Sequence, residues 1–176
     1  DDDAKDQLEH DIKEMTAMLN SYVSFVRGEV PETIENIQLD ELIKNISKTN
    51  KSNIHNIINI HSKRINTSGR PLQLRRAIQN IIDNAKRYAT KIQINLTSSD
   101  EECFISISDD GPGIPSENYE DIFKPFFTLD PSRNQLKGES GLGMTISRDI
   151  IRSHGGDIKL SQSDMGGLKI TINLPL

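Results

Sequence analysis

Two asparagines stand four residues apart in a segment whose apolar residues repeat with the spacing of a helix. Asn80 and Asn84 share one side of this predicted helix, and Arg87 and Tyr88 follow one turn later. An asparagine side-chain oxygen is a hard ligand that suits Mg²⁺, which usually takes its other ligands from water and phosphate oxygens. By itself the row is more typical of a solvated helix flank, so a magnesium-phosphate site needs support from other segments.

The segment from Asp109 to Ile114 is a second candidate, because it ends an alternating strand pattern with two glycines and a proline. Glycine at a strand end lets the backbone approach a ligand closely, and Pro112 limits the freedom of the loop. A carboxylate here can accept from an exocyclic amine, so Asp109 would favour adenine over guanine, which offers a carbonyl there. A tight turn made of common turn residues is an equally good interpretation.

A third segment, Gly138-Glu139-Ser140-Gly141-Leu142-Gly143, precedes another helical pattern. Backbone N–H groups at the start of a helix bind phosphate with the help of the helix dipole. The segment is not a P-loop, because no Lys-Ser or Lys-Thr pair follows the glycines. Alone it is weak evidence for a phosphate site.

The elements that must position these groups alternate between helix and strand patterns. The long helix predicted over 71–89 carries an apolar stripe of Leu74, Ile78, Ile81, Ile82 and Ala85. Strands are predicted over 35–39, 54–60, 92–96, 103–107, 158–161 and 168–174, and further helices over 40–50 and 142–154. Asp40 is the expected N-cap of the earlier helix, and a turn is expected from Ser68 to Arg70. This order predicts an α/β fold.

The first 28 residues differ from the rest, because they read as one helix with a narrow apolar seam. Its members follow a 4-3-4-3-4 heptad spacing and are Leu8, Ile12, Met15, Leu19, Tyr22 and Val26. Gly28 is expected to end the helix, and Pro31 lies beyond it. No later segment has a matching seam, so we predict half of a helical hairpin or bundle over 1–28 and a globular domain over 29–176.

The composition of the 176 residues excludes several classes of function. With 34% hydrophobic and 27% charged residues, the chain is typical of a soluble globular protein and has no run of the roughly 18 apolar residues that span a membrane. A net charge of −5 without a basic cluster argues against nucleic acid as a partner. The one cysteine, Cys103, is expected to be a buried strand residue in reducing surroundings.

Together and in this order, the segments resemble the ATPase superfamily of DNA gyrase, heat-shock chaperones, histidine kinases and MutL. Residues 80–85 resemble its N-box, 109–113 its first glycine box and 140–143 its second. Residues 123–126, Phe-Lys-Pro-Phe, are similar to the F-box, which occurs mainly in histidine kinases. The resemblance covers roughly 35–176. It implies a two-layer α/β sandwich with helices on one face of a mixed sheet, and Mg-ATP between the asparagine helix and a glycine-flanked lid.

The resemblance is closer still to one group of kinases. Residues 123–134, 148–150 and 153–157 look like EnvZ-type osmolarity-sensor kinases of alphaproteobacteria. The N-terminal helix then resembles the second helix of the dimerisation and histidine-phosphotransfer hairpin. This implies the cytoplasmic portion of an inner-membrane sensor, with no membrane contact by this segment. The implied partners are the missing hairpin helix, a homodimer partner and a response-regulator receiver domain.

The resemblance also implies a role for each matching residue. Asn84 would ligate Mg²⁺, with Asn80 beside it near the phosphates, and Asp109 would accept from the adenine amine. The other positions expected at ATP are Arg87 on the phosphates, Tyr88 on adenine, Gly111, Gly113 and Ile114 around the base, and Gly141, Leu142 and Gly143 at the lid. Lys124, Arg133 and Lys137 could add charge over the phosphates, although solvated loop cations are at least as good an interpretation.

One position distinguishes the branches of this superfamily. The branches that hydrolyse ATP carry a water-activating glutamate four residues before the metal asparagine, where this chain has Asn80. An asparagine cannot act as a general base at neutral pH. The expected activity is therefore transfer of the γ-phosphoryl group of ATP to a histidine, and from there to a response-regulator aspartate. A gyrase-like or chaperone-like ATPase is disfavoured.

Two departures qualify this expectation. None of His10, His55, His61 and His154 has the sequence context of a phosphoacceptor, so we expect no catalytic residue in this fragment and an acceptor outside it. Glu139 stands where relatives usually have glycine, and its charge would weaken the binding of ATP. An interaction module that senses ATP without catalysis is the alternative function.

Overall fold

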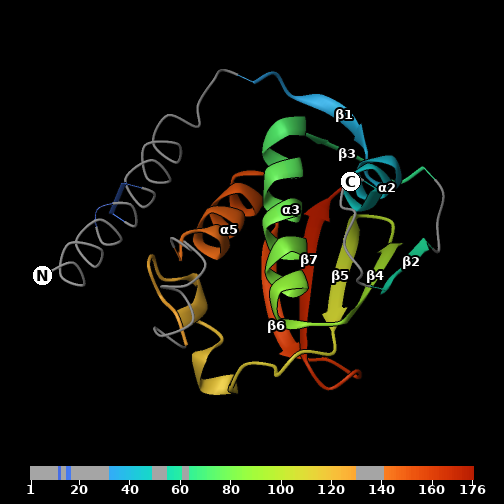
Figure 1. Cartoon of the computed structure of the whole chain (residues 1–176). Coiled ribbons are helices and arrows are strands. Elements are labelled where there is room, and N and C mark those ends of the chain that lie inside the picture. The colour runs from blue at the N-terminus through green and yellow to red at the C-terminus, as the bar shows by residue number, and fades with distance from the viewer. Residues whose placement is uncertain (1–11, 13–14, 17–31, 49–54, 61–63, 130–140) are drawn as a thin grey trace, which may run out of the picture.

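The fold is a five-stranded sheet with its helices on one face, as the computed structural model shows (Figure 1). The structure describes residues 12, 15–16, 32–48, 55–60, 64–129 and 141–176. Its elements are β1 (Glu35–Gln38), α2 (Leu39–Lys48), β2 (His55–Ile60), β3 (Asn66–Gly69), α3 (Pro71–Tyr88), β4 (Lys91–Ser98), β5 (Glu102–Asp109), the 3₁₀ turns η1 (Ser116–Asn118) and η2 (Asp121–Phe123), α5 (Gly143–Ser153), β6 (Asp157–Gln162) and β7 (Leu168–Pro175).

The sheet is mixed, and its strands follow the order β2-β4-β5-β7-β6. β2 runs parallel to β4, whereas every other pair in this sheet is antiparallel. A parallel neighbour needs a crossover, and α3 is part of the connection from β2 to β4. This arrangement confirms the predicted two-layer α/β sandwich.

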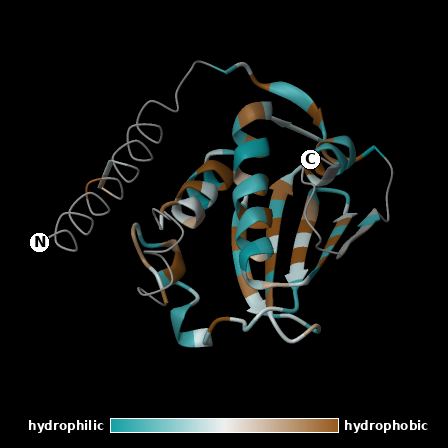
Figure 2. Ribbon diagram, in the orientation of Figure 1, coloured by the Kyte–Doolittle hydropathy of each residue, from teal (hydrophilic) through white to brown (hydrophobic). Residues whose placement is uncertain are grey.

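The core lies between the helices and the inner face of the sheet. Residues along β4, β5 and β7 alternate between buried and more exposed, as the colour bands in Figure 2 also show. The buried residues of α3 are Leu74, Ala77, Ile78, Ile81, Ile82 and Ala85, which contain the whole predicted stripe. Cys103 is fully buried, as predicted, and burial raises the pKa of its thiol to about 11.

Two local predictions were wrong. The first helix after β1 begins at Leu39, so Asp40 lies inside the first turn and is not the N-cap; it is buried and pairs with Lys44 at 3.2 Å. Ser68 and Gly69 form the end of β3, which pairs antiparallel with β1, where a turn was expected. Turn-type residues adopt a strand here because a partner strand and the burial of Thr67 override their local preference.

The start of α3 is fastened to the end of α5 through His154. The backbone N–H of Arg70 donates to His154 Nε2 at 3.0 Å, and His154 Nδ1 lies 2.7 Å from the carbonyl oxygen of Ile150. Because Nε2 accepts, the ring is neutral with its proton on Nδ1. No side chain fits at Gly69, since a Cβ there would lie 2.7 Å from His154 Cδ2.

This contact makes the fold sensitive to mild acid. Burial lowers the pKa of His154 below its value in the unfolded chain, so the unfolded state takes up the proton first. The contribution of His154 to stability is therefore complete above about pH 6.5 and is lost as the pH falls through the folded-state pKa. We expect the urea midpoint to fall between pH 7.5 and pH 5.5, and His154→Gln to flatten that dependence. An equal pH dependence in both proteins would contradict this assignment.

Little of the N-terminal heptad prediction falls on described residues. Residues 12 and 15–16 are helical, and the Thr16 hydroxyl donates to the carbonyl oxygen of Ile12 at 2.7 Å. Ile12 and Met15, two members of the seam, are 54% and 70% exposed. The other seam residues lie outside the described part of the chain. Among the helices that are described, none is long and apolar enough to cross a membrane.

Candidate nucleotide site

The asparagine row of α3 lies beside the first turn of α5. Asn80 Nδ2 donates to the carbonyl oxygen of Gly143 at 3.4 Å, and Asn80 Cβ lies 3.9 Å from where a Cβ on Gly143 would be. Buried Ser147 lies in the same contact, because its hydroxyl oxygen is 2.8 Å from the carbonyl oxygen of Gly143 and 3.1 Å from that of Ala77. The structure therefore joins the N-box to the second glycine box across 63 residues.

The N-terminus of α5 is free of side-chain caps among the described residues. Leu142 is the N-cap, makes no side-chain hydrogen bond and is followed by no acidic residue in the first turn. The Ile146 N–H donates to the Leu142 carbonyl, which is the first hydrogen bond of the helix. The N–H groups before Ile146 in the first turn therefore have no partner within the helix. Such an end attracts an anion such as a phosphate. The Leu142 side chain is buried, so only its backbone can serve the site.

Gly141, at the C-terminal end of the predicted lid, packs against Phe126. It has a φ of 61°, and a Cβ on it would lie 2.9 Å from Phe126 Cα. The Phe126 N–H donates to the Gly141 carbonyl at 3.2 Å, which holds the two sides of this loop together. Residues 130–140, which include Arg133, Lys137 and Glu139, lie outside the described part of the chain.

The F-box is held against α5 by Arg148. Its guanidinium stacks over the ring of Phe123 at 4.3 Å and donates to the carboxylate of Glu120 at 2.7 Å. The Thr145 hydroxyl also donates to the Phe123 carbonyl at 2.9 Å. Lys124 is exposed and paired with Asp121, which lies just before the F-box in η2.

The paired aspartates at the end of β5 have different roles. Asp110 caps the turn between α3 and β4, since it accepts from the N–H groups of Thr90 and Lys91, both at 2.8 Å, and from the Thr90 hydroxyl at 2.7 Å. These bonds hold the pKa of Asp110 at about 2. Asp109 is buried, and burial raises its pKa. Asp109 is therefore the carboxylate that fits a ligand site.

Among the described residues, hydrogen-bond donors reach one oxygen of Asp109. Oδ1 accepts from the N–H of Gly111 at 2.9 Å and from the N–H of Leu168 at 3.1 Å. No hydrogen bond to Oδ2 comes from the described part of the chain, so this oxygen can accept from a ligand amine. The hydrogen bonds from these two N–H groups lower the pKa of Asp109 and so oppose the effect of burial. They favour the ionised carboxylate, which accepts hydrogen bonds.

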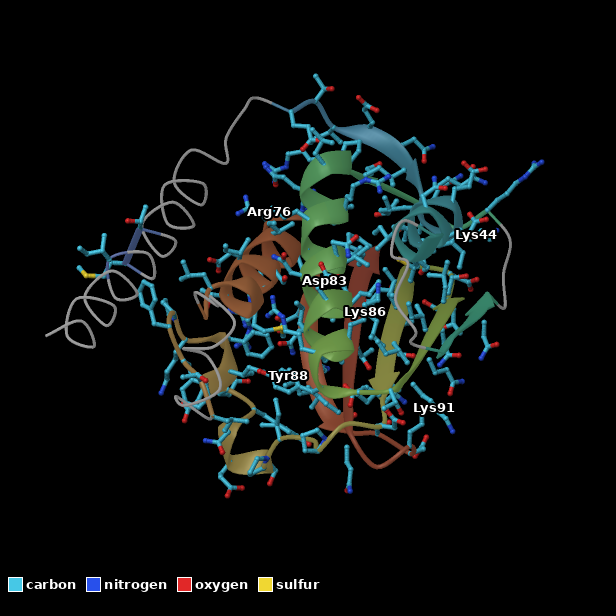
Figure 3. The ribbon with its side chains drawn as sticks, in the orientation of Figure 1. Lys44, Arg76, Asp83, Lys86, Tyr88 and Lys91 are labelled. Carbon is cyan, nitrogen blue, oxygen red and sulfur yellow. The ribbon has the colours of Figure 1, made fainter. Side chains whose placement is uncertain are left out.

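The remaining predicted residues surround Asp109 and the end of α3. Gly113 has a φ of 70°, a conformation that favours glycine, and Ile114 packs against the core while staying half-exposed. Gly111 is confined, because a Cβ on it would lie 3.0 Å from both Asp109 Oδ1 and the Tyr88 carbonyl. Arg87 and Tyr88 are exposed at the C-terminal end of α3, where Figure 3 labels Tyr88.

The site has the donors that Mg-ATP would need. Asn84 is half-buried one turn from Asn80, and its side chain makes no hydrogen bond with the described residues, so its oxygen is available to a cation. Among the described residues, no three His, Cys, Asp or Glu side chains come together as a metal site. A magnesium ion at Asn84 would therefore take most of its ligands from phosphate and water.

Gly167 and Leu168 are the site residues that sequence reasoning missed. Gly166-Gly167 predicts only a turn before the strand at 168–174, yet the N–H of Leu168 donates to Asp109 Oδ1 at 3.1 Å and the N–H of Gly167 donates to the Asp109 carbonyl at 3.2 Å. The Gly-Gly pair indicated a turn, and no local signal indicated that this turn reaches the end of β5.

Comparisons with known proteins identify the class to which this fold and site belong. Residues 69–176 match the family described as histidine kinase-, DNA gyrase B- and HSP90-like ATPase. The chain belongs to this family. Within it, the chain is an ATP-binding catalytic domain of the two-component sensor histidine kinase type.

The relatives support the same conclusion. Sensor histidine kinase CpxA of Escherichia coli K12 is 32% identical over 179 residues, which cover 97% of this chain and 39% of CpxA. GtrS of Pseudomonas aeruginosa is 29% identical over 177 residues, which cover 99% of this chain and 36% of GtrS. The mycobacterial sensor kinase MprB has a TM-score of 0.71 at 25% identity, covering 81% of this chain and 97% of that structure. The chain thus spans less than two-fifths of the length of CpxA and of GtrS.

Proposed function

We propose that this domain holds Mg-ATP between α3 and α5 and donates its γ-phosphoryl group to a histidine outside residues 1–176. The observation that carries the proposal is the juxtaposition of Asn80 with Gly143, which places an asparagine row beside an uncapped helix N-terminus. Phosphates would bind to the first N–H groups of α5, adenine would lie at Asp109, and Asn84 would ligate Mg²⁺.

The chemistry of the row favours phosphoryl transfer over hydrolysis. Asn80 has no proton-accepting side chain of the strength that water activation needs, and its amide nitrogen is committed to Gly143. The chain's own residues would then position the phosphates and balance their charge, which is most of what phosphoryl transfer requires. Arg87 would add positive charge to the phosphates, and Tyr88 would pack on adenine.

The acceptor would lie on a hairpin of which this chain supplies one helix. We propose that residues 1–28 are its second helix and 29–176 the catalytic domain; the exposure of Ile12 and Met15 supports an unpaired seam. His154 is unsuited as an acceptor, since both ring nitrogens lie within bonding distance of backbone groups. A homodimer partner and a response-regulator receiver domain would complete the pathway.

The type of kinase rests on sequence motifs. Residues 123–134, 148–150 and 153–157 support an EnvZ-type osmolarity sensor of alphaproteobacterial origin. We propose accordingly that the domain is the cytoplasmic portion of an inner-membrane sensor.

Phosphotransfer in trans tests the proposal. The full 176-residue chain is mixed with the complete hairpin of its parent protein and with ATP labelled at the γ-phosphate. Acid-labile label on the hairpin, dependent on Mg²⁺ and lost when the acceptor histidine becomes alanine, is expected. Binding of ATP without any transfer would support the alternative of a nucleotide-sensing module, and sustained release of phosphate by the chain alone would indicate an ATPase.

A further inference from the structure

The turn between β6 and β7 contacts the carboxylate that would select the base. We propose that Gly167 and Leu168, at the end of this turn, position Asp109 for recognition of the 6-amino group of adenine, and that glycine at 167 is what permits it. The inference rests on the proposed function and adds a positioning residue from a turn, between β6 and β7, that carries none of the sequence motifs.

Three hydrogen bonds attach the turn and its neighbouring loop to Asp109. The Gly167 N–H donates to the Asp109 carbonyl at 3.2 Å, and the Leu168 N–H donates to Oδ1 at 3.1 Å. The Gly111 N–H donates to the same Oδ1 at 2.9 Å. Two donors on one oxygen fix the rotation of the carboxylate, and Oδ2 is left as the acceptor for a ligand amine.

Any side chain at 167 would destroy this geometry. A Cβ on Gly167 would lie 2.1 Å from Asp109 Oδ1, 2.6 Å from the Asp109 carbonyl oxygen and 2.6 Å from the Gly111 nitrogen. Two of these are backbone atoms, so rotation of the Asp109 side chain alone cannot relieve the overlap. Either the turn or the glycine loop must move, and both supply the donors that orient Asp109.

Gly166 offers a matched comparison in the same turn. Its φ of 100° makes alanine strained there, but a Cβ would meet no heavy atom within 4 Å. Gly166→Ala therefore disturbs the turn's backbone preference without entering the space beside Asp109. A purely structural role for the turn predicts similar effects of the two substitutions, whereas a positioning role predicts a loss of base recognition only in Gly167→Ala.

The experiment compares ATP with purine riboside 5′-triphosphate, which lacks only the 6-amino group, by calorimetric titration of the full chain with Mg²⁺. A hydrogen bond to a charged group is typically worth about 10- to 100-fold in affinity, so the wild-type chain and Gly166→Ala should prefer ATP by about 10-fold or more. Gly167→Ala should prefer ATP by less than about 3-fold. Adding Asp109→Ala to Gly167→Ala should cause no further loss of this preference. A folded Gly167→Ala that keeps the wild-type preference would overturn the inference.

The other outcomes are also informative. Equal wild-type affinities for the two nucleotides would overturn the inference and leave ATP binding intact, whereas binding of neither would refute the proposed function itself. If Gly167→Ala does not fold, nuclear magnetic resonance of the wild-type chain tests the positioning role through the amide signal of Leu168. This signal should shift more on binding ATP than on binding the analogue, and equal shifts would contradict the positioning role.

Discussion

Replacing Asn84 by alanine is expected to remove most of the Mg²⁺ dependence of ATP binding. The side chain of Asn84 makes no hydrogen bond with the described residues, so its oxygen has no structural role in α3 among them. Loss of a residue that only supports a metal ligand typically costs about 10- to 100-fold in affinity, and loss of a ligand should cost at least as much. Calorimetric titration of ATP into the variant should give similar affinities with Mg²⁺ and with EDTA.

Asn95→Ala is the matched control for this substitution. Asn95 lies on the outer face of the sheet, where it accepts from Asn59 at 3.0 Å and donates to Ser106 at 3.3 Å. Its loss should lower stability by about 1 kcal/mol, the usual size of such bonds, and leave the binding of Mg-ATP unchanged. An Asn84→Ala protein that retains the wild-type response to Mg²⁺ would show that the metal is held elsewhere.

Replacing Asp109 by asparagine is expected to change which purine the domain prefers. The amide oxygen can still accept from Gly111 and Leu168, and the amide nitrogen then takes the place of Oδ2. A donor there suits the 6-carbonyl of inosine triphosphate and opposes the 6-amino group of ATP. We expect the affinity for ATP to fall about 10- to 100-fold and the affinity for inosine triphosphate to rise. Competition titrations of the two nucleotides measure both.

Asp110→Asn is the matched control, because it removes the same charge from the residue next to Asp109. Asp110 caps the turn at Thr90 and Lys91, and its low pKa of about 2 reflects those bonds. The variant should be less stable to heat yet keep the wild-type preference for ATP over inosine triphosphate. If instead Asp110→Asn changes base preference and Asp109→Asn does not, the assignment of the two aspartates must be reversed.

The sequence predicts the elements better than the contacts between them. Helix α3 and the strands β4, β5 and β7 are predictable because a buried stripe or an alternating face repeats with a fixed period. Asn80, Asn84 and Asp109 are recognisable because they occupy special places in those elements, on one helix side and at one strand end. The order of the patterns predicts an α/β fold, whereas the two-layer arrangement was expected from the family resemblance and is confirmed by the structure.

Long-range contacts give no local signal. Asp109 and Asp110 are adjacent and have the same side chain, and contacts with Leu168 for the first and with Thr90 for the second give them different roles. Leu168 is 59 residues away from Asp109, so no period or turn rule brings them together. The pairing of β1 with β3 was missed because Ser68 and Gly69 favour turns until a partner strand is present.

The most direct test of a Mg-ATP site between α3 and α5 is a calorimetric titration of ATP into the wild-type 176-residue chain, once with Mg²⁺ and once with EDTA. We expect one site per chain, with affinity about 10-fold or more higher in Mg²⁺ and with preference for ATP over inosine triphosphate. No binding, or binding that ignores both the metal and the base, would contradict it.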